Sequence, residues 1–292
     1  MKKMIAKIII TGIILILLAY TGFTVYNYTS SPSAPDGGYI HMSFDDTISL
    51  FEDITNNQDR YESVFDNEML AYCKELHEEY GAVFSFYCFY QNDDFNLLNC
   101  THKFQQDFKD NADWLKFGFH NMSDQGNLAN STLSEATEYY TTVTKQLIEI
   151  TGSEDCIDTV IRLQNFAGSS EAVDGLLSSE TRIKGLLTAD DDRISYFLDD
   201  NDSRYISEHD DYFEQSKKIY LVSTDLRLEN SVVPYNDLTA ICKDANQNKI
   251  IEVFTHEWKY NAITKSKMKT VCEFAKKAGY EWKYPMDNIV YE

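Results

Sequence analysis

The chain has 292 residues, and its 47 aspartates and glutamates outnumber its 26 lysines and arginines to give a net charge of −21. This balance excludes nucleic acid and anionic lipid as electrostatically recruited partners, because phosphate binding needs clustered Lys and Arg. A neutral or cationic substrate fits better, although an acidic surface also simply keeps an exported protein soluble.

The N-terminus has the composition of a membrane anchor. Lys2, Lys3 and Lys7 precede an apolar run from Ile8 to Val25, which is long enough to cross a bilayer core of about 30 Å as a helix. Lysines on the cytoplasmic flank predict that the rest of the chain is exported. We therefore expect an N-terminal membrane anchor or signal segment over residues 1–28. No small-x-small cleavage site follows the run, which favours an uncleaved single-pass anchor over a cleaved signal peptide.

A Ser/Pro/Gly-rich stretch over residues 29–38 is typical of a linker, and the folded domain is expected over residues 39–292, enough for one large core. Within this domain, short apolar runs alternate with amphipathic segments, the pattern of repeated βα units around a parallel sheet. Strands are predicted at residues 39–44, 82–90, 115–120, 159–165, 183–188, 218–224 and 249–255. Helices are predicted at residues 67–80, 134–151, 170–177, 235–245 and 262–278. The pattern predicts an α/β fold, a distorted (β/α)7-type barrel preceded by an N-terminal transmembrane helix.

Residues 190–215 interrupt this alternation with a dense acidic run, which predicts an insertion, a small hairpin over the mouth of the barrel. Calcium binding and a solvated face are both open for its acids, and the solvated face is favoured. These acids are Asp190, Asp191, Asp192, Asp199 and Asp200.

The cysteines show no C-x-x-C spacing, which excludes a zinc knuckle and a redox motif. Export would permit disulfides. Cys73, Cys242 and Cys272 nevertheless lie in apolar helical patterns, where a buried free thiol is the commoner state.

Two adjacent carboxylates follow the first predicted strand. In a parallel barrel, functional groups gather at the C-terminal ends of the strands. Because successive side chains of a strand alternate in direction, Asp45 and Asp46 can serve different roles, one binding a metal and the other acting as a base. An Asp-Asp-Thr sequence is also a common helix-capping turn, so the pair alone leaves both interpretations open.

Further polar residues occur in or after later strands. His120 and Asp124 are four residues apart, the separation that brings two side chains to one face of a helical turn, as ligands of one metal require. Asp124 could equally cap a turn, with His120 a histidine of the barrel rim. Arg162 lies in the fourth predicted strand and Asp225 follows the sixth. His256 ends the seventh and could donate a proton to a leaving group.

Together and in this order, these residues resemble the motifs of the polysaccharide deacetylase family, also called the NodB-homology or carbohydrate esterase family 4 group, over residues 39–279. Residues 43–46, Ser-Phe-Asp-Asp, resemble its first motif, usually Thr-Phe-Asp-Asp-Gly. Residues 117–124 resemble the second, usually His-x-x-x-His, with an aspartate in place of the second histidine. Residues 162–166 resemble the third but lack its proline, and residues 253–256 resemble the last.

The resemblance implies a barrel of the glycoside hydrolase/deacetylase kind with one divalent metal ion. Asp46, His120 and Asp124 would be the ligands, and the ion would be Zn²⁺, with Co²⁺, Mn²⁺ or Ni²⁺ as alternatives. An aspartate in place of the second histidine makes the ligand set harder and more anionic, which would weaken the Lewis acidity of the ion.

The resemblance also implies the acid/base roles. Asp45 would be the catalytic base, tethered by Arg162. His256 would be the general acid, oriented by Asp225. No other cofactor and no covalent intermediate would be needed.

The resulting hypothesis is a monomeric hydrolase that removes acetyl groups from an extracellular or cell-wall N-acetylated polysaccharide, with its catalytic domain outside the cell membrane. The altered second and third motifs suggest an alternative, a non-catalytic or weakly active glycan-binding surface protein on the same barrel. A third hypothesis, hydrolysis of a glycosidic bond on a metal-bearing barrel, ranks lowest.

Overall fold

The computed structural model describes residues 11–12 and 33–285 of the chain. The anchor predicted over residues 1–28 lies outside these ranges, apart from Thr11 and Gly12. Within the ranges described, no helix is long and apolar enough to cross a membrane. The second half of the predicted linker is in contact with the domain, because Ala34 donates its backbone N–H to the carbonyl oxygen of Ala278 at 2.8 Å.

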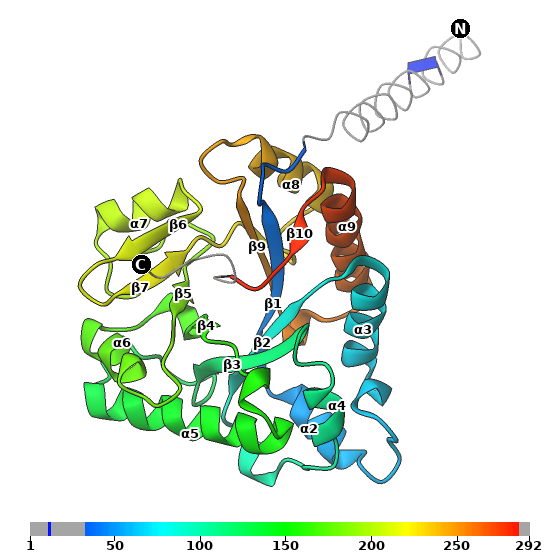
Figure 1. Cartoon of the computed structure of the whole chain (residues 1–292), viewed down its shortest axis with the longest axis vertical. Helices are drawn as coiled ribbons and strands as arrows, with labels where there is room; N and C mark the ends of the chain where they lie inside the picture. Colours follow the sequence, from blue (N-terminus) through cyan, green and yellow to red (C-terminus); the bar gives the residue numbers. More distant parts are fainter. Residues whose placement is uncertain (1–10, 13–32, 286–292) are drawn as a thin grey trace, which may run out of the picture.

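A parallel sheet forms the centre of the molecule (Figure 1). Its strands run in the order β3-β2-β1-β9-β8, with β10 also pairing with β1. Their bounds are β1 Tyr39–Thr47, β2 Phe84–Phe89, β3 Leu115–Asn121, β8 Leu226–Arg227, β9 Ile250–His256 and β10 Glu281–Trp282. All their pairings are parallel. β1 and β9 are buried along almost their whole length, as expected for parallel strands covered on both faces.

A second sheet continues the first. It runs in the order β4-β5-β7-β6, with bounds β4 Val160–Ile161, β5 Gly185–Leu187, β6 Asp211–Glu214 and β7 Ile219–Val222. A parallel bridge between Phe117 and Ile157 joins β3 to the segment that precedes β4, and the chain passes after three residues from β7 to β8. The strands therefore follow one another around an incomplete barrel. The predicted α/β fold with a parallel sheet is confirmed, and every predicted strand range overlaps an observed strand.

Helices pack on the outside of the sheets, with α3 beside α9 and α5 beside α6 (Figure 1). Their bounds are α2 Ser49–Asn56, α3 Glu68–Tyr80, α4 Gln105–Lys109, α5 Leu133–Thr151, α6 Ser170–Leu177, α7 Asp200–Ser207, α8 Pro234–Lys243 and α9 Ala262–Ala278. The predicted bounds of α6 and α9 are confirmed, and those of α3, α5 and α8 differ by one or two residues. The sequence analysis did not predict α2, α4 and α7, which are short.

Side-chain caps explain where two of the long helices begin. Asn67 accepts hydrogen bonds from two backbone N–H groups in the first turn of α3, and Asn261 does the same for α9. α9 ends at Gly279, whose φ of 85° is in the left-handed region, as the basic final turn followed by glycine predicted. These caps fix the helix that follows β9 and hence the end of β9 itself.

The acidic insertion has a different form from the predicted one. Residues 190–215 contain α7 and β6, and β6 forms an antiparallel hairpin with β7. Asp190 is ion-paired with Arg227, and Asp191 with Arg193. Nowhere in the described part of the chain are three or more His, Cys, Asp or Glu side chains grouped to hold a metal ion, so the insertion contains no calcium site of that kind there.

All six cysteines are buried free thiols, as predicted for Cys73, Cys242 and Cys272. Burial raises the pKa of each of these three thiols. Because the thiolate is the reactive form, this environment disfavours a catalytic role for them.

Candidate active site

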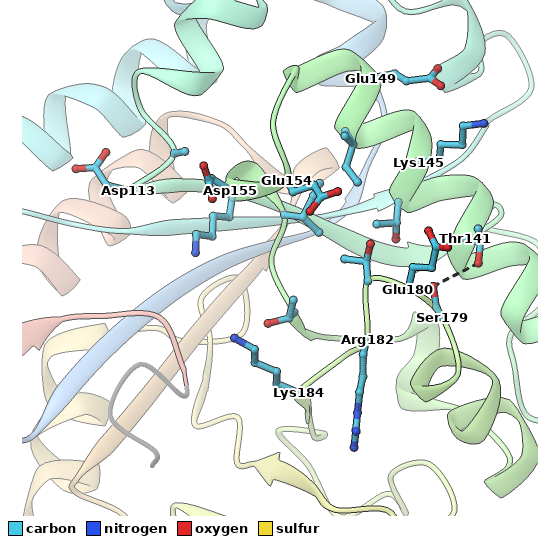
Figure 2. Close-up of a pocket in the computed structure, with 17 residues that line it drawn as sticks. Asp113, Thr141, Lys145, Glu149, Glu154, Asp155, Ser179, Glu180, Arg182 and Lys184 are labelled. Atoms are coloured by element: carbon cyan, nitrogen blue, oxygen red, sulfur yellow. Dashed lines mark hydrogen bonds between the residues drawn. The ribbon is translucent and has the colours of Figure 1, made fainter. Parts of the chain in front are cut away.

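Two hollows lie at opposite ends of the barrel. The larger, of about 990 Å³, lies at the N-terminal ends of β3, β4 and β5 (Figure 2). Its charged lining is of mixed sign, and Lys145, Arg182 and Glu180 are exposed. It contains no histidine. This end of a parallel barrel is the one that ordinarily carries stability rather than catalysis.

The smaller hollow, of about 220 Å³, lies at the C-terminal ends of the strands. It is lined by Asp45, Asp46, His120, Leu163, Gln164, Asn165, Phe166, Arg193, Arg227, His256 and Trp258. Four of the seven residues predicted from sequence are in this lining, and Arg162 lies directly behind it. The parallel order of β1, β3 and β9 brings them together, because all three strands end at this side.

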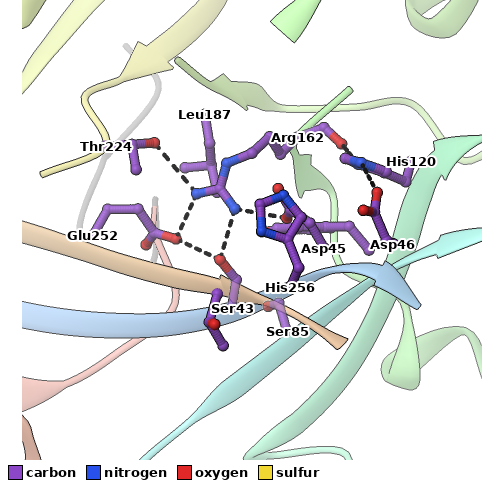
Figure 3. A network of polar contacts seen from close by, with 12 residues as sticks. Ser43, Asp45, Asp46, Ser85, His120, Arg162, Leu187, Thr224, Glu252 and His256 are labelled. Carbon is purple, nitrogen blue, oxygen red and sulfur yellow. Dashed lines mark hydrogen bonds and ion pairs between the residues drawn. The ribbon is translucent and has the colours of Figure 1, made fainter. Parts of the chain in front are cut away.

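Asp45 is the inner carboxylate of the pair on β1. It is 2% exposed, and the Nη1 of Arg162 donates to its Oδ1 at 2.8 Å (Figure 3). This is the contact that the family resemblance implied. Asp45 is also in register with His256 of β9, which places the two side chains on adjacent strands at the same level of the barrel.

A buried polar network holds Arg162 from behind. Its Nη2 donates to Oε1 of Glu252 at 3.2 Å, and Ser43 accepts from Arg162 and donates to the same oxygen of Glu252, each at 2.9 Å (Figure 3). The other carboxylate oxygen of Glu252 is 2.7 Å from Nδ1 of His41, whose Nε2 is 2.9 Å from the hydroxyl of Ser85. Arg162, Glu252 and His41 are each 0% exposed. The interior of the barrel is therefore partly ionic, not purely apolar.

The charge of Arg162 is maintained by this network. Burial alone would lower the pKa of Arg162, but the nearby carboxylates of Asp45 and Glu252 outweigh it and raise that pKa. A guanidinium fixed between two carboxylates holds the position of Asp45 and compensates its charge.

Asp46 lines the same hollow as Asp45 but contacts different partners. Its φ of 59° is in the left-handed region, and the pairing of β1 with β2 shifts register at this point, which indicates a local bulge. Oδ1 of Asp46 lies 3.3 Å from Nε2 of His120, and Oδ2 accepts a hydrogen bond from the indole N–H of Trp258 at 2.9 Å. Burial would raise the pKa of Asp46, but the hydrogen bond and charge of His120 outweigh it and lower that pKa.

The environment of His120 fits a metal ligand. Its Nδ1 lies 2.5 Å from the carbonyl oxygen of Arg162, a contact that requires the proton on Nδ1. Nε2 then has its lone pair directed to the side of Asp46, where a cation could be shared by the imidazole and the carboxylate. Nε2 of His120 and Oδ1 of Asp46 are 3.3 Å apart, so one ion could bind both atoms at the usual metal–ligand distances of about 2.0–2.2 Å. A metal-ligating histidine usually donates a hydrogen bond from its other ring nitrogen to a carbonyl or carboxylate oxygen, as Nδ1 does here.

Asp124 does not join this pair, so the predicted three-residue ligand set is wrong. His120 belongs to β3, and residues 122–125 form bends, not the helical turn on which the four-residue spacing was interpreted. The Asp124 side chain is exposed, and the described residues contain no cluster of three possible ligands. Asp46 and His120 therefore fit a cation that takes two ligands from the protein and the rest from solvent or substrate.

His256 is oriented by Glu229, not by the predicted Asp225. Nδ1 of His256 lies 2.5 Å from Oε1 of Glu229, whose Oε2 accepts from the hydroxyl of Thr255 at 2.9 Å. Asp225 instead accepts the backbone N–H of Glu252 at 2.8 Å. Since strand residues rise about 3.3 Å each, that contact lies roughly 13 Å along β9 from His256. The sequence analysis assigned the first acid after β7, whereas the orienting acid follows β8.

The contact with Glu229 controls the charge of His256. Burial would lower the pKa of His256, but the hydrogen bond that it donates to Glu229 and the charges of Asp45, Glu229 and Asp46 outweigh burial and raise that pKa. The Nδ1–H of His256 is committed to Glu229, which leaves Nε2 for the pocket.

Glu257 fixes the backbone that directly follows β1, a role that was not predicted from the sequence. Its carboxylate accepts the backbone N–H groups of residues 48, 49 and 50 at 3.0, 2.8 and 2.6 Å, at the start of α2. Burial raises the pKa of Glu257, and these three hydrogen bonds oppose that effect. The contact ties the residue after His256 to the loop after Asp46.

The mouth of the pocket contains strained backbone. Asn165 and Phe166 have φ values of 58° and 55°, a conformation that costs a non-glycine residue energy and is concentrated at functional sites. Asp46, Asn165 and Phe166 all have a positive φ, and all three line the same small hollow.

No family model matches the chain, and no curated protein sequence matches it. Among solved structures, the Bc1960 peptidoglycan N-acetylglucosamine deacetylase is 12% identical, with 86% of this chain and 88% of that chain covered and a TM-score of 0.43. A family 4 carbohydrate esterase from Streptomyces lividans is 10% identical, with 85% and 92% covered and a TM-score of 0.42. BA3943, a CE4 family pseudoenzyme from Bacillus anthracis, is 10% identical, with 84% and 62% covered and a TM-score of 0.43. Similarity at this level leaves the assignment of function to the residues of the chain itself.

Proposed function

We propose that the chain is a metal-dependent hydrolase that removes acetyl groups from an N-acetylated polysaccharide. The observation that supports this most directly is the pair of acid/base groups on neighbouring strands, each held by its own buried partner. Asp45 is held by Arg162 and His256 by Glu229. Both line a hollow that also contains Asp46 beside His120.

The two groups suit the two proton transfers of amide hydrolysis. Asp45, charged and fixed by Arg162, would accept the proton of the attacking water. His256, kept protonated by Glu229, would donate its Nε2 proton to the departing amine. A carboxylate held by a guanidinium beside an imidazole held by a carboxylate provides one group suited to each transfer.

Asp46 and His120 would hold the divalent ion, which we propose to be Zn²⁺, with Co²⁺, Mn²⁺ or Ni²⁺ as alternatives. When bound, the ion would polarise the carbonyl of the acetamide group and lower the pKa of a water. Metal affinity should fall at low pH, because protons compete with the ion for its ligands.

The mouth of the hollow is suited to a neutral glycan. The indole of Trp258 is 64% exposed, and an exposed, fixed aromatic ring provides a stacking surface for a sugar. The side chains of Gln164 and Asn165 add amide groups that can bond hydroxyls. We further propose that the chain works as a monomer outside the cell membrane, anchored by residues 1–28.

One observation favours a second candidate, a non-catalytic or weakly active glycan-binding protein. Catalytic zinc sites ordinarily take three ligands from the protein, and Asp46 with His120 provides two. The same hollow and the same Trp258 would then bind the glycan without turnover.

Metal content and acetate release from the purified full-length chain separate the two candidates. The substrate is an N-acetylated chito-oligosaccharide, with and without Zn²⁺, Co²⁺ or Mn²⁺. We expect about one bound ion per chain and metal-dependent acetate release, both lost in Asp46→Asn, and acetate release alone lost in Asp45→Asn. Asp124→Asn is the matched control and should retain both. Glycan binding without bound metal or acetate would establish the second candidate.

A further inference from the structure

Trp258 differs from the other tryptophans in exposure and in the contact of its indole N–H. Trp114 is 2% exposed and donates to Asn111, and the buried indole nitrogen of Trp282 has no hydrogen-bond partner among the described residues. Trp258 is 64% exposed, yet its N–H is directed inwards to Asp46. One side chain thus contacts both solvent and the proposed metal ligand.

The base of Trp258 is rigid. It lies in the short 3₁₀ turn Glu257–Lys259 that directly follows β9. The preceding residue, Glu257, is fixed by three backbone N–H groups at the start of α2. The position of the indole is therefore set by the same turn that positions Asp46.

The N–H of Trp258 determines which oxygen of Asp46 is available. Oδ2 accepts from the indole at 2.9 Å, and Oδ1 lies 3.3 Å from Nε2 of His120. With Oδ2 occupied, Asp46 presents Oδ1 alone to a cation shared with His120. A hydrogen bond from a neighbour to a ligating carboxylate commonly changes metal affinity by about 10–100-fold.

The ring of Trp258 is in contact with the acid/base side of the hollow. Its centroid lies 5.4 Å from that of His256, and the ammonium of Lys259 lies 4.2 Å from the ring centroid. Among the described residues, Lys259 alone places a cation over this ring, and a cation–π contact at an exposed site contributes only about 0.5–1 kcal/mol, which a stacked sugar can replace.

We propose that Trp258 is a positioning residue that couples glycan binding to metal binding. A sugar stacked on the ring would hold the indole in place, its N–H would hold Asp46, and Asp46 would hold the cation with His120. Because coupling between two ligands is reciprocal, bound cation strengthens glycan binding by the same factor. This inference rests on the proposed function, since it takes the glycan and the cation from it.

The test uses Co²⁺ as the metal probe and N-acetylated chitotetraose as the glycan, with the full-length chain. Co²⁺ affinity is measured from its visible absorption with and without glycan, and glycan affinity by calorimetry with and without Co²⁺. Trp258→Phe retains a stacking ring but loses the N–H, and Trp258→Ala loses both. Trp282→Phe is the matched control, because it removes an indole N–H that has no hydrogen-bond partner within residues 33–285.

For wild type we expect each ligand to strengthen the other by at least about fivefold. Trp258→Phe should weaken Co²⁺ binding by about tenfold, retain glycan affinity in the absence of metal, and abolish the mutual enhancement. Trp258→Ala should lose affinity for both ligands, and Trp282→Phe should match wild type.

Unchanged Co²⁺ affinity in Trp258→Phe would overturn the inference, and so would wild-type protein in which the two ligands bind independently. Failure of the proposed function gives a different result. If wild type binds Co²⁺ and glycan cooperatively but releases no acetate, the hydrolase assignment fails and the role of Trp258 stands. If wild type binds no Co²⁺, both fail.

Discussion

Replacement of Arg162 by methionine tests whether the ionic interior of the barrel holds the site together. Methionine fills most of the volume, so the cavity contribution stays small and the change mainly removes charge. The variant leaves Asp45, 2% exposed, and Glu252, 0% exposed, without the cation that lies 2.8 and 3.2 Å from them. Removing one partner of a buried ion pair typically costs about 3–5 kcal/mol. With two carboxylates left uncompensated, the upper end of that range is expected.

Such a loss is large against the total free energy of unfolding of a domain, about 5–15 kcal/mol. Urea denaturation at pH 7, followed by circular dichroism, should show a lower midpoint with an unchanged m value. Adding Glu252→Gln to Arg162→Met removes one of the uncompensated charges. The double variant should therefore recover about 1–3 kcal/mol relative to Arg162→Met alone, a coupling of the size seen between contacting residues.

Arg182→Met is the matched control, because Arg182 is exposed at the opposite end of the barrel. It should change stability by no more than about 0.5 kcal/mol. A loss below about 1 kcal/mol in Arg162→Met would refute the reasoning, and so would a double variant less stable than Arg162→Met.

The remaining predictions concern titrating groups. Glu229→Gln should lower the pKa of His256, measured by NMR of the imidazole, because the hydrogen bond and charge that outweigh burial are removed, whereas Asp225→Asn should leave it unchanged. The raised pKa of His256 stabilises the folded protein at pH values below the pKa of an unfolded histidine, about 6.5. This stabilisation is lost as the pH rises through the pKa of His256 in the folded protein. The melting temperature of wild type should therefore exceed that of Glu229→Gln by more at pH 6 than at pH 9. Burial raises the pKa of Asp210 to about 6, so wild type loses stability through this group as the pH rises from about 4 to 6. Asp210→Asn should lack that loss, and equal melting-temperature differences between pH 4 and pH 7 in both proteins would contradict it.

Hydrophobic pattern sufficed to predict the frame of the barrel. The long buried strands β1 and β9 are rich in apolar residues, and α9 has both a periodic face and a clear end. Helix α2 escaped prediction because its start is capped from a distance by Glu257, through contacts more than two hundred residues apart. No local signal in the sequence identifies such a cap.

The site was predictable where function depends on strand order and not where it depends on turn geometry. Asp45, His120 and Arg162 meet because their strands end on one side. Asp124 was misplaced because a four-residue spacing indicates a shared face only in a helix, and the chain after β3 bends. Asp225 was chosen over Glu229 because the break between β7 and β8 is not visible in the apolar pattern.

A single acidic residue inside the apolar strand β9 could have predicted the buried ionic network from the sequence. Glu252 interrupts Ile250-Ile-Glu-Val-Phe254 of β9, and its partner in register on β1 is His41. A charged residue in a strand buried on both faces must be compensated by a neighbour. That requirement alone would have indicated an ionic network inside the barrel.

The two sides of the barrel differ in how freely their sequences can change, because the pairing of β1 with β9 is long and the strands on the other side are short. Asp45 faces His256 across the longest strand pairing in the described part of the chain, seven consecutive residues, whereas β4, β5 and β8 have two or three residues each. The spacing between the two proton-transferring groups is thus built into the half with the most backbone bonds. Loops on the other half, the acidic insertion included, can lengthen, shorten or change sequence without altering that spacing, so diversification among descendants of this chain should be concentrated there.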